Sequence, residues 1–227
     1  MTILIVCATE PELALFAAEL RAHPRHQIDI LTTGVGMVAT AAWCSSAMTK
    51  RRYDLALNLG VCGSFDPSIT LGTVVHVVSD RLAELGAEDG DAFLTLGDLG
   101  LLRTDPLRFD GDLVVNTNPP LSEALQALPA VAGITVNTVH GSERSIAEVL
   151  ARVRRLDPRV PLVESMEGAA FMYACLINGV PFAQVRAVSN HVERRNRAAW
   201  KMEDAIRNLG ASALGILGTL SDVQRGS

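Results

Sequence analysis

The feature that constrains the fold most is a set of six short segments whose apolar residues are continuous rather than alternating. The segments are rich in Val, Ile, Leu and Ala, and they cover residues 3–6, 28–31, 55–59, 73–78, 134–139 and 182–188. A strand with apolar residues on both faces is buried on both faces, which is typical of central strands in a parallel or mixed sheet.

Amphipathic segments separate these strands, with apolar residues recurring every three or four positions. They cover residues 10–21, 37–51, 144–155, 166–177 and 198–220. Alternating strands and helices predict a three-layer α/β/α fold with a central mixed, largely parallel sheet. We expect a single domain over residues 1–222 and a frayed C-terminus at 223–227. Residues 86–120 are rich in Gly, Asp and Pro and predict a long loop or excursion.

The composition excludes several classes of protein. The chain is 48% hydrophobic, so it has enough apolar surface for a core and is not disordered. Its formal net charge of −5 disfavours binding to a phosphate backbone. With only 6 Phe, 2 Trp and 2 Tyr, stacking platforms for single-stranded nucleic acid are scarce. We therefore expect no nucleic-acid partner.

Cysteine and histidine spacing gives no sign of a metal site. The four cysteines lack a CxxC pair and the five histidines lack an HxxxH pair, so neither zinc nor a disulfide framework is expected. We predict no metal and no cofactor. The apolar N-terminus has no preceding basic region, and the uncharged residues 30–49 contain a GVG turn. Both observations favour a cytoplasmic protein without a membrane partner.

Polar and glycine-rich residues follow the first two predicted strands. This matters because ligand sites in α/β sheets lie beyond the carboxyl ends of the strands. Glu10 and Glu12 follow the first strand, where a carboxylate either holds a water molecule or simply favours a helix N-terminus. The Gly-x-Gly of residues 34–36 permits a close ligand or forms a tight turn, and it lacks the third glycine of a dinucleotide-binding motif.

Three later segments also lie where a strand ends or a helix begins. Residues 58–64 contain two glycines three apart, which either admit a ligand or relieve a crowded turn; Cys62 among them has no neighbouring base. Glu167 begins a helix with small apolar residues, where it either interacts with the helix dipole or binds hydroxyl groups. Ser189 and Asn190 follow the last strand and either cap a local turn or reach the common edge. His191 is a surface or core histidine.

Taken together, the motifs TGVGMVATA, NLGVCGSF, VESMEGAA and RAVSN, with Glu12 after the first strand, carry a family resemblance. The chain resembles the nucleoside phosphorylase/hydrolase superfamily, and most closely its methylthioadenosine/S-adenosylhomocysteine nucleosidases and futalosine hydrolases. The resemblance implies that Glu12 holds the attacking water, that Glu167 binds ribosyl hydroxyls and that Met166 packs on the sugar. It also implies a purine nucleoside as substrate and a homo-oligomer, either a dimer or a multiple of dimers. The other substrate-binding residues it implies are Gly60, Val61, Cys62, Gly63, Val139, His140 and Ser189.

Two asparagines refine the expected reaction. Family phosphorylases have an Arg for phosphate where this chain has Asn58, so we expect water to be the nucleophile. Adenine-specific members have Asp where this chain has Asn190. An Asn amide can donate to N7 or O6 of a 6-oxopurine, whereas an ionised Asp would repel O6. The resemblance thus implies hydrolysis of futalosine to hypoxanthine and dehypoxanthine futalosine, in menaquinone biosynthesis, with Asn190 binding the leaving base.

Other functions stay open at this point. The chain is alternatively an adenine-releasing nucleosidase acting on methylthioadenosine, S-adenosylhomocysteine or aminodeoxyfutalosine, and Asn190 counts against this. A purine nucleoside phosphorylase and a non-catalytic nucleoside-binding protein are further alternatives. If the substrate is futalosine, one of Arg194, Arg195 and Arg197 is expected to pair with its carboxylate; otherwise these residues form a solvated charge run.

Overall fold

The computed structural model describes residues 1–101, 109–110, 113–156 and 161–221 of the 227-residue chain. The main sheet consists of β1 (Thr2–Cys7), β2 (Gln27–Thr32), β3 (Leu55–Ser64), β4 (Val74–Leu82), β7 (Phe109–Asp110), β8 (Leu113–Val115), β9 (Ala130–Thr135), β10 (Leu162–Ser165) and β11 (Phe182–His191). A separate hairpin pairs β5 (Gly86–Asp89) with β6 (Ala92–Thr95). The helices are α1 (Ala17–Arg21), α2 (Met37–Lys50), α3 (Glu123–Gln126), α4 (Glu143–Leu156), α5 (Gly168–Asn178) and α6 (Met202–Thr219), with short 3-10 helices η1 (Glu10–Glu12) and η2 (Arg197–Ala199).

The sheet is mixed, and part of it closes on itself. β2, β1 and β3 are parallel neighbours, and β11 lies parallel to β3 on its other side. β11 also pairs with β4, β4 with β9, β9 with β10, and β10 returns to β3. The chain thereby brings the ends of β10 and β11 next to that of β3, which is about a hundred residues away in the sequence.

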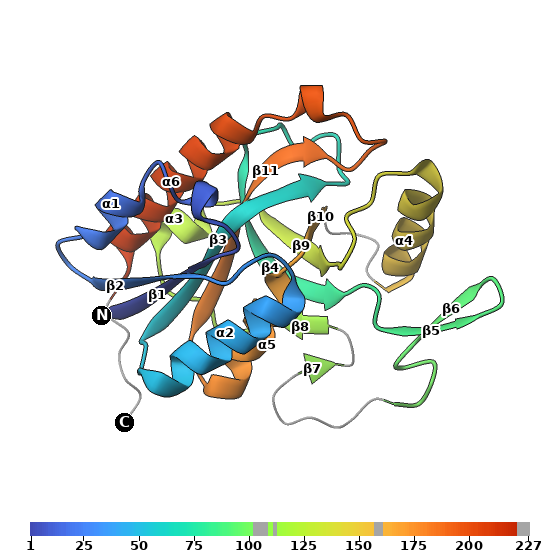
Figure 1. Cartoon of the computed structure of the whole chain (residues 1–227), viewed down its shortest axis with the longest axis horizontal. Helices are drawn as coiled ribbons and strands as arrows, with labels where there is room; N and C mark the ends of the chain where they lie inside the picture. Colours follow the sequence, from blue (N-terminus) through green and yellow to red (C-terminus); the bar gives the residue numbers. More distant parts are fainter. Residues whose placement is uncertain (102–108, 111–112, 157–160, 222–227) are drawn as a thin grey trace.

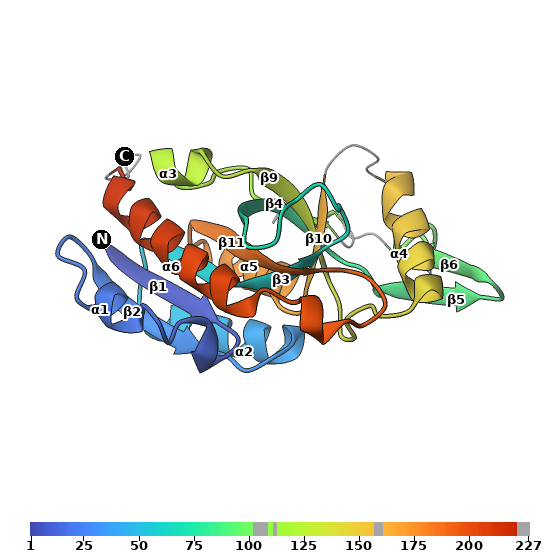
Figure 2. The ribbon, with the colours of Figure 1, turned by 90° about the horizontal axis from the view of Figure 1, so that it is seen from above.

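Helices cover both faces of the open part of the sheet (Figures 1 and 2). On one face, Ile3 and Ile5 of β1 pack with Leu209 and Ile216 of α6, and α1 joins the same cluster. On the other face, the intervening Leu4 and Val6 pack against α2 and α5. Because successive strand residues point to opposite faces, a strand between two helical layers needs apolar residues at every position. The predicted three-layer α/β/α architecture is confirmed.

The structure corrects three details of the sequence analysis. The predicted helix over 10–21 is broken into η1 and α1, because the Glu12 side chain turns back to accept backbone hydrogen bonds. The predicted strand over 134–139 instead runs from Ala130 to Thr135. Its alanines and Gly133 weaken the sequence signal, and a Cβ at Gly133 would lie 2.6 Å from Asp80 Oδ2. The described part of 86–120 contains the strands β5, β6, β7 and β8 rather than one long loop.

The C-terminus, the cysteines and the helices bear on three further predictions. The predicted frayed residues 223–227 lie outside the described residues. All four cysteines are described, and all are free and buried. Among the helices of the described ranges, none has the length and apolar character to cross a membrane.

Candidate active site

Glu12 is held where β1 ends, with its carboxylate turned toward β3. Its Oε2 accepts hydrogen bonds from the backbone N–H groups of Ala8 at 3.1 Å and Thr9 at 2.8 Å. The other oxygen, Oε1, accepts from the N–H of Val61 at 3.3 Å. The residue is only 8% exposed. The carboxylate is therefore fixed by two strands and keeps unused acceptor positions on Oε1.

Arg186 of β11 is a site residue to which the sequence analysis gave no role. It is fully buried beside Gly60, with which it pairs across the parallel strands. Arg186 Nη1 and Glu12 Oε1 both lie less than 3.0 Å from the point that a Cβ on Gly60 would occupy. Arg186 Nη2 donates to Asn58 Oδ1. The missing side chain of Gly60 thus leaves the space in which a cation and a carboxylate approach each other.

Glu167 brings a second carboxylate to the same arginine. It is the residue before α5, it is buried, and its Oε2 lies 3.7 Å from Arg186 Nη1. Its Oε1 accepts a hydrogen bond from the N–H of Gly36 at 3.1 Å. Met166 precedes it and is partly exposed. Among the described residues, Arg186 Nη1 has no hydrogen-bond partner, so it faces two carboxylates with a donor still available.

Ser189 and Asn190 lie further along β11, opposite the second glycine of the β3 segment. Asn190 pairs with Gly63, and a Cβ on Gly63 would lie 3.1 Å from Asn190 Nδ2. Asn190 Nδ2 donates to the carbonyl oxygen of His191 at 2.9 Å, and Asn190 Oδ1 accepts from the Ser189 hydroxyl at 2.8 Å. These two contacts orient the amide, with one N–H left to donate.

The loop before α4 packs against β10 next to these residues. His140 is held by Glu164 of β10: its backbone N–H donates to Oε1 at 2.9 Å, and its Nδ1 contacts Oε2. Glu164 is a second residue to which the sequence analysis gave no role. Phe65 lies edge-on to the His140 ring, with the ring centroids 6.3 Å apart. Val139 is 43% exposed.

Cys62 leaves only its backbone for a ligand. Its side chain packs in an apolar cluster with Val75, Val163 and Val188. Burial raises the pKa of its thiol to about 12, so the thiolate needed for nucleophilic attack is not accessible near neutral pH. Its carbonyl oxygen accepts a hydrogen bond from the Ser189 hydroxyl at 3.2 Å.

A buried polar group lies beneath the start of α5. Asp80 Oδ1 accepts from the Thr135 hydroxyl at 2.8 Å, and Oδ2 accepts from Gln184 Nε2 at 2.9 Å. Thr135 Oγ1 in turn accepts from the N–H of Ala169 in the first turn of α5. Burial raises the pKa of Asp80 to about 6, although these hydrogen bonds oppose the shift. The helix that carries Glu167 is thus anchored by Asp80.

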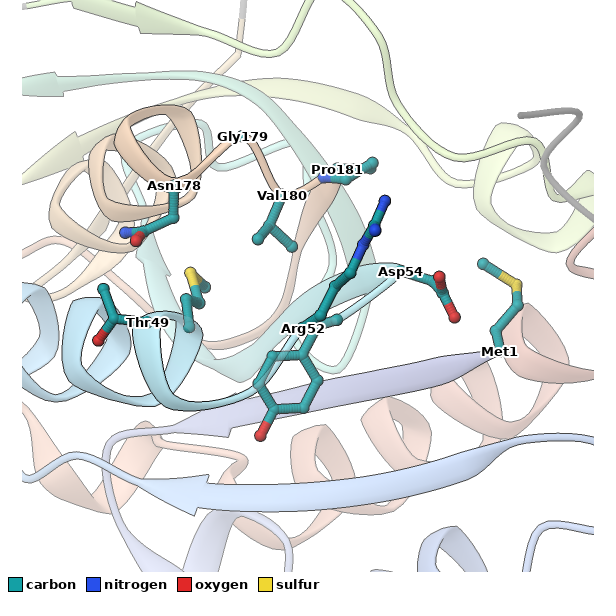
Figure 3. A pocket seen from close by; sticks show the side chains of 10 residues that line it. Met1, Thr49, Arg52, Asp54, Asn178, Gly179, Val180 and Pro181 are labelled. Atoms are coloured by element: carbon teal, nitrogen blue, oxygen red, sulfur yellow. The ribbon is translucent and has the colours of Figure 1, made fainter. Parts of the chain in front are cut away.

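Figure 3 shows a hollow of about 820 Å³ at the opposite end of the sheet. It lies at the amino ends of β1, β3 and β11, and it is lined by residues such as Met1, Arg52, Asp54, Asn178 and Pro181. None of the predicted site residues lines it. This hollow is therefore separate from the candidate site.

Comparisons with known proteins agree with this geometry. The family profile described as "Phosphorylase superfamily" matches residues 2–218. The chain belongs to the phosphorylase superfamily. Within it, the chain is 35% identical over 192 residues to a futalosine hydrolase of Streptomyces coelicolor, covering 80% of this chain and 74% of the relative. It is 30% identical over 195 residues to a futalosine hydrolase of Thermus thermophilus, covering 82% of this chain and 80% of that relative.

Solved structures of the superfamily share the fold. A futalosine hydrolase of Helicobacter pylori superposes with a TM-score of 0.75 at 14% identity, covering 96% of this chain and 97% of that one. A methylthioadenosine/S-adenosylhomocysteine nucleosidase of Colwellia psychrerythraea, solved with adenine, superposes with a TM-score of 0.74 at 23% identity. The match covers 97% of this chain and 96% of that one. The comparisons confirm the assignment of this chain to the nucleosidases of the superfamily, that is, to enzymes that hydrolyse N-ribosyl bonds.

Within the described residues, no group of three or more His, Cys, Asp and Glu side chains is arranged to hold a metal ion. The polar groups of the site are instead paired carboxylates, one arginine and amide or hydroxyl groups. These groups suit hydrogen bonding to a sugar, a water molecule and a heterocyclic base.

Proposed function

We propose that this protein hydrolyses the N-ribosidic bond of futalosine and releases hypoxanthine. The observation that carries the reaction is the approach of Glu12 and Arg186 over Gly60. A water molecule between them would accept a hydrogen bond from Arg186 Nη1 and donate one to Glu12 Oε1. Its oxygen would be directed by fixed groups, which is what positioning contributes to catalysis.

The charge around Arg186 favours water over phosphate as the nucleophile. A phosphorylase needs a net positive pocket for the phosphate anion. Here Arg186 is shared between Asn58 and Glu167, and Glu12 lies on its other side. Two carboxylates outnumber the one cation, so an entering phosphate would be repelled while a neutral water would not.

The proposed step breaks the bond between C1′ of the ribose and the purine nitrogen. The electron pair of that bond goes to the purine, positive charge develops on the sugar, and the water oxygen bonds to C1′. Glu12 takes the proton that the water loses, and the purine takes its proton from solvent. Glu167 accepts hydrogen bonds from the ribosyl hydroxyls and Met166 packs on the sugar, so carboxylates surround the developing charge.

Asn190 supports a 6-oxopurine as the leaving base. Its Nδ2 lies beside Gly63 and keeps one N–H that would donate to N7 or O6. It stabilises the departing base by hydrogen bonding and has no acidic proton to transfer. The alternative base, adenine, presents a donor where hypoxanthine presents O6, so it meets the same N–H unfavourably.

The substrate's carboxylate would lie beyond the ribose, near the segment that follows β11. The Cζ atoms of Arg195 and Arg197 in this segment lie 5.8 Å and 5.9 Å from the centroid of the Trp200 ring. Arg194 borders a groove along α4. We propose that one of these three arginines pairs with the carboxylate. Replacing them with Gln one at a time should raise the KM for futalosine far more than for inosine; no such difference in any variant would refute the pairing.

A homo-oligomer is part of the same proposal. Val35 and Val38 lie close in sequence to Gly36, which contacts Glu167, and they are 56% and 79% exposed; Trp43, further along α2, is 55% exposed. Exposed apolar side chains close to a site support a subunit contact there. Light scattering of the purified protein would give the mass; a monomer at micromolar concentration would contradict this part.

The direct test incubates the protein with futalosine and with methylthioadenosine in phosphate-free buffer and identifies the released base by chromatography. Hypoxanthine from futalosine, at a rate that added phosphate does not raise, is the expected result. Turnover only with phosphate would indicate a phosphorylase, and absence of any base would indicate a binding protein.

A further inference from the structure

A row of buried polar side chains lies beneath the start of α5. Asp80 is on β4, Thr135 is on the neighbouring β9, and Gln184 is on β11, which pairs with the other edge of β4. All three residues are 1% exposed or less. Asp80 joins the other two, because its carboxylate accepts from the Thr135 hydroxyl at 2.8 Å and from Gln184 Nε2 at 2.9 Å. Burying a carboxylate costs folding free energy even when it is hydrogen-bonded, which favours a role other than stability.

This row contacts the backbone of the two residues that follow Glu167. Thr135 Oγ1 accepts a hydrogen bond from the Ala169 N–H at 2.7 Å. A Cβ on Gly168 would collide with Asp80 Oδ2 and with the side-chain amide of Gln184, so the backbone of Gly168 rests directly on the row. The hydrogen bond and the close contact together fix the point at which the chain enters α5.

The contacts of the Glu167 side chain itself are long. Its Oε1 accepts from the N–H of Gly36 at 3.1 Å, and its Oε2 accepts from the N–H of Met166 at 3.3 Å. Arg186 Nη1 lies 3.7 Å from Oε2, which is beyond the range of a hydrogen bond. The position of this carboxylate therefore depends on the backbone from which it projects, at the start of α5.

The Asp80 carboxylate sets the orientation of the Thr135 hydroxyl. A hydroxyl group has one hydrogen to donate and two lone pairs with which to accept. Because the hydrogen points at Asp80 Oδ1, a lone pair is left to face the N–H of Ala169. Without the carboxylate, the hydroxyl would be free to turn and this hydrogen bond would weaken.

We infer that Thr135 and Asp80 are positioning residues that hold Glu167 where it binds the ribosyl hydroxyls of the substrate. The inference rests on the proposed function, in which Glu167 accepts hydrogen bonds from these hydroxyls. Thr135 fixes the first turn of α5, and Asp80 orients Thr135. Both residues act through Glu167 and neither contacts the substrate.

The test measures binding of two ligands by calorimetry. One is a C-nucleoside analogue of inosine, whose ribosyl C–C bond cannot be hydrolysed, and the other is its 2′,3′-dideoxy form. The wild-type protein should bind the ribosyl form about tenfold more tightly, because a hydrogen bond to a carboxylate contributes on this order. Thr135→Val has the same shape but no hydroxyl, so it should reduce this preference about fivefold. Thr135→Ser keeps the hydroxyl and should retain the preference.

The matched control is Ser122→Ala. Ser122 is also a buried hydroxyl residue, and it accepts from the N–H of Leu125 in the first turn of α3 at 3.2 Å. Since α3 packs against α6, this variant loses a comparable hydrogen bond away from Glu167. It should keep the wild-type preference between the two ligands.

Asp80 gives a second pair of variants. Asp80→Ala removes the acceptor of the Thr135 hydroxyl and should reduce the preference about as much as Thr135→Val. Asp80→Asn keeps an acceptor for this hydroxyl. Its amide can donate to Gln184 Oε1, which is buried without a hydrogen-bond partner among the described residues. Asp80→Asn should therefore retain the preference, and an equal loss in both Asp80 variants would contradict the positioning role.

A double variant tests whether Thr135 acts through Glu167. Glu167→Gln should lose most of the preference by itself, and adding Thr135→Val should then cause no further loss. A further loss, no preference in the wild-type protein, an unchanged preference in Thr135→Val or the same loss in Ser122→Ala would each overturn the inference. If futalosine is not hydrolysed but the preference is present and depends on the Thr135 hydroxyl, the proposed reaction fails and the inference stands.

Discussion

The two halves of the site are built in contrasting ways. The sugar half comprises Glu12, Gly60, Glu167 and Arg186, and it is charged, buried and tied to the backbone of β1, β3 and the segment before α2. The base half comprises Gly63, His140, Glu164, Ser189 and Asn190, and in it Gly63 pairs with Glu164 of β10 on one side and with Asn190 of β11 on the other. We infer that the sugar half performs the reaction, while the base half selects the substrate.

The largest effect should come from the sugar half. Glu12→Gln removes the group that takes the proton from water, so we expect kcat to fall about 10²- to 10⁴-fold with little change in KM. Steady-state kinetics with futalosine measure both. Glu10→Gln is the matched control, since Glu10 is an exposed neighbour in η1 and should leave kcat unchanged. Undiminished turnover in Glu12→Gln would remove this residue from the mechanism.

The next effect tests the close approach over Gly60. In Gly60→Ala the new methyl group would collide with Arg186 and Glu12, so we expect kcat to fall about 100-fold and the free energy of unfolding to fall by about 1–3 kcal/mol. Steady-state kinetics measure kcat, and urea unfolding measures the free energy of unfolding. Gly218→Ala, where nothing lies within 4 Å of the added carbon, should leave kcat unchanged and should not lower the free energy of unfolding, because Ala favours the helix α6. Normal turnover in Gly60→Ala would show that the approach is not needed.

A change in the base half should alter the preference between the two substrates more than the rate of hydrolysis. Asn190→Asp replaces a donor with a carboxylate that repels O6, so we expect the ratio of kcat/KM for futalosine over aminodeoxyfutalosine to fall about tenfold. Competition assays with both substrates give this ratio. The same change at the exposed Asn196 should leave it unaltered. If Asn190→Asp also left the ratio unaltered, base selection would have to lie elsewhere.

The last effect concerns the stability of the fold rather than catalysis, and it arises at Asp80 beneath the start of α5. The pKa of Asp80 is raised to about 6, above its ordinary 3.8, so its protonated form stabilises the fold. That stability is complete below about pH 4 and is lost as the pH rises through 6, which amounts to about 3 kcal/mol. Asp80→Asn should therefore gain stability relative to wild type between pH 4 and pH 7, as measured by urea unfolding. A relative loss over that range would contradict the shift.

Much of the fold follows from local patterns, because strands buried on both faces are continuously apolar. The hairpin of β5 and β6 was missed as a strand pair, although Gly90 and Asp91 form the two-residue loop between the strands, and a Gly with positive φ at the first loop position favours hairpins. The closure of the sheet through β10 could not be predicted, since it depends on contacts between strands that are about a hundred residues apart.

The sequence likewise predicted some of the site residues and not others. Glu12, Glu167 and Asn190 stand in motifs with a recognisable order along the chain. Arg186 had a usable signal, because a charged residue inside an apolar strand needs a buried partner. Glu164 had none, because its partner His140 comes from another element and no fixed spacing links the two.

The most direct test of the division between the halves is a competition between futalosine and aminodeoxyfutalosine, which differ at position 6 of the purine. Equimolar substrates are mixed with the wild-type protein in phosphate-free buffer, and the hypoxanthine and adenine released at early times are quantified. We predict at least tenfold more hypoxanthine than adenine. Equal amounts, or an excess of adenine, would contradict the account.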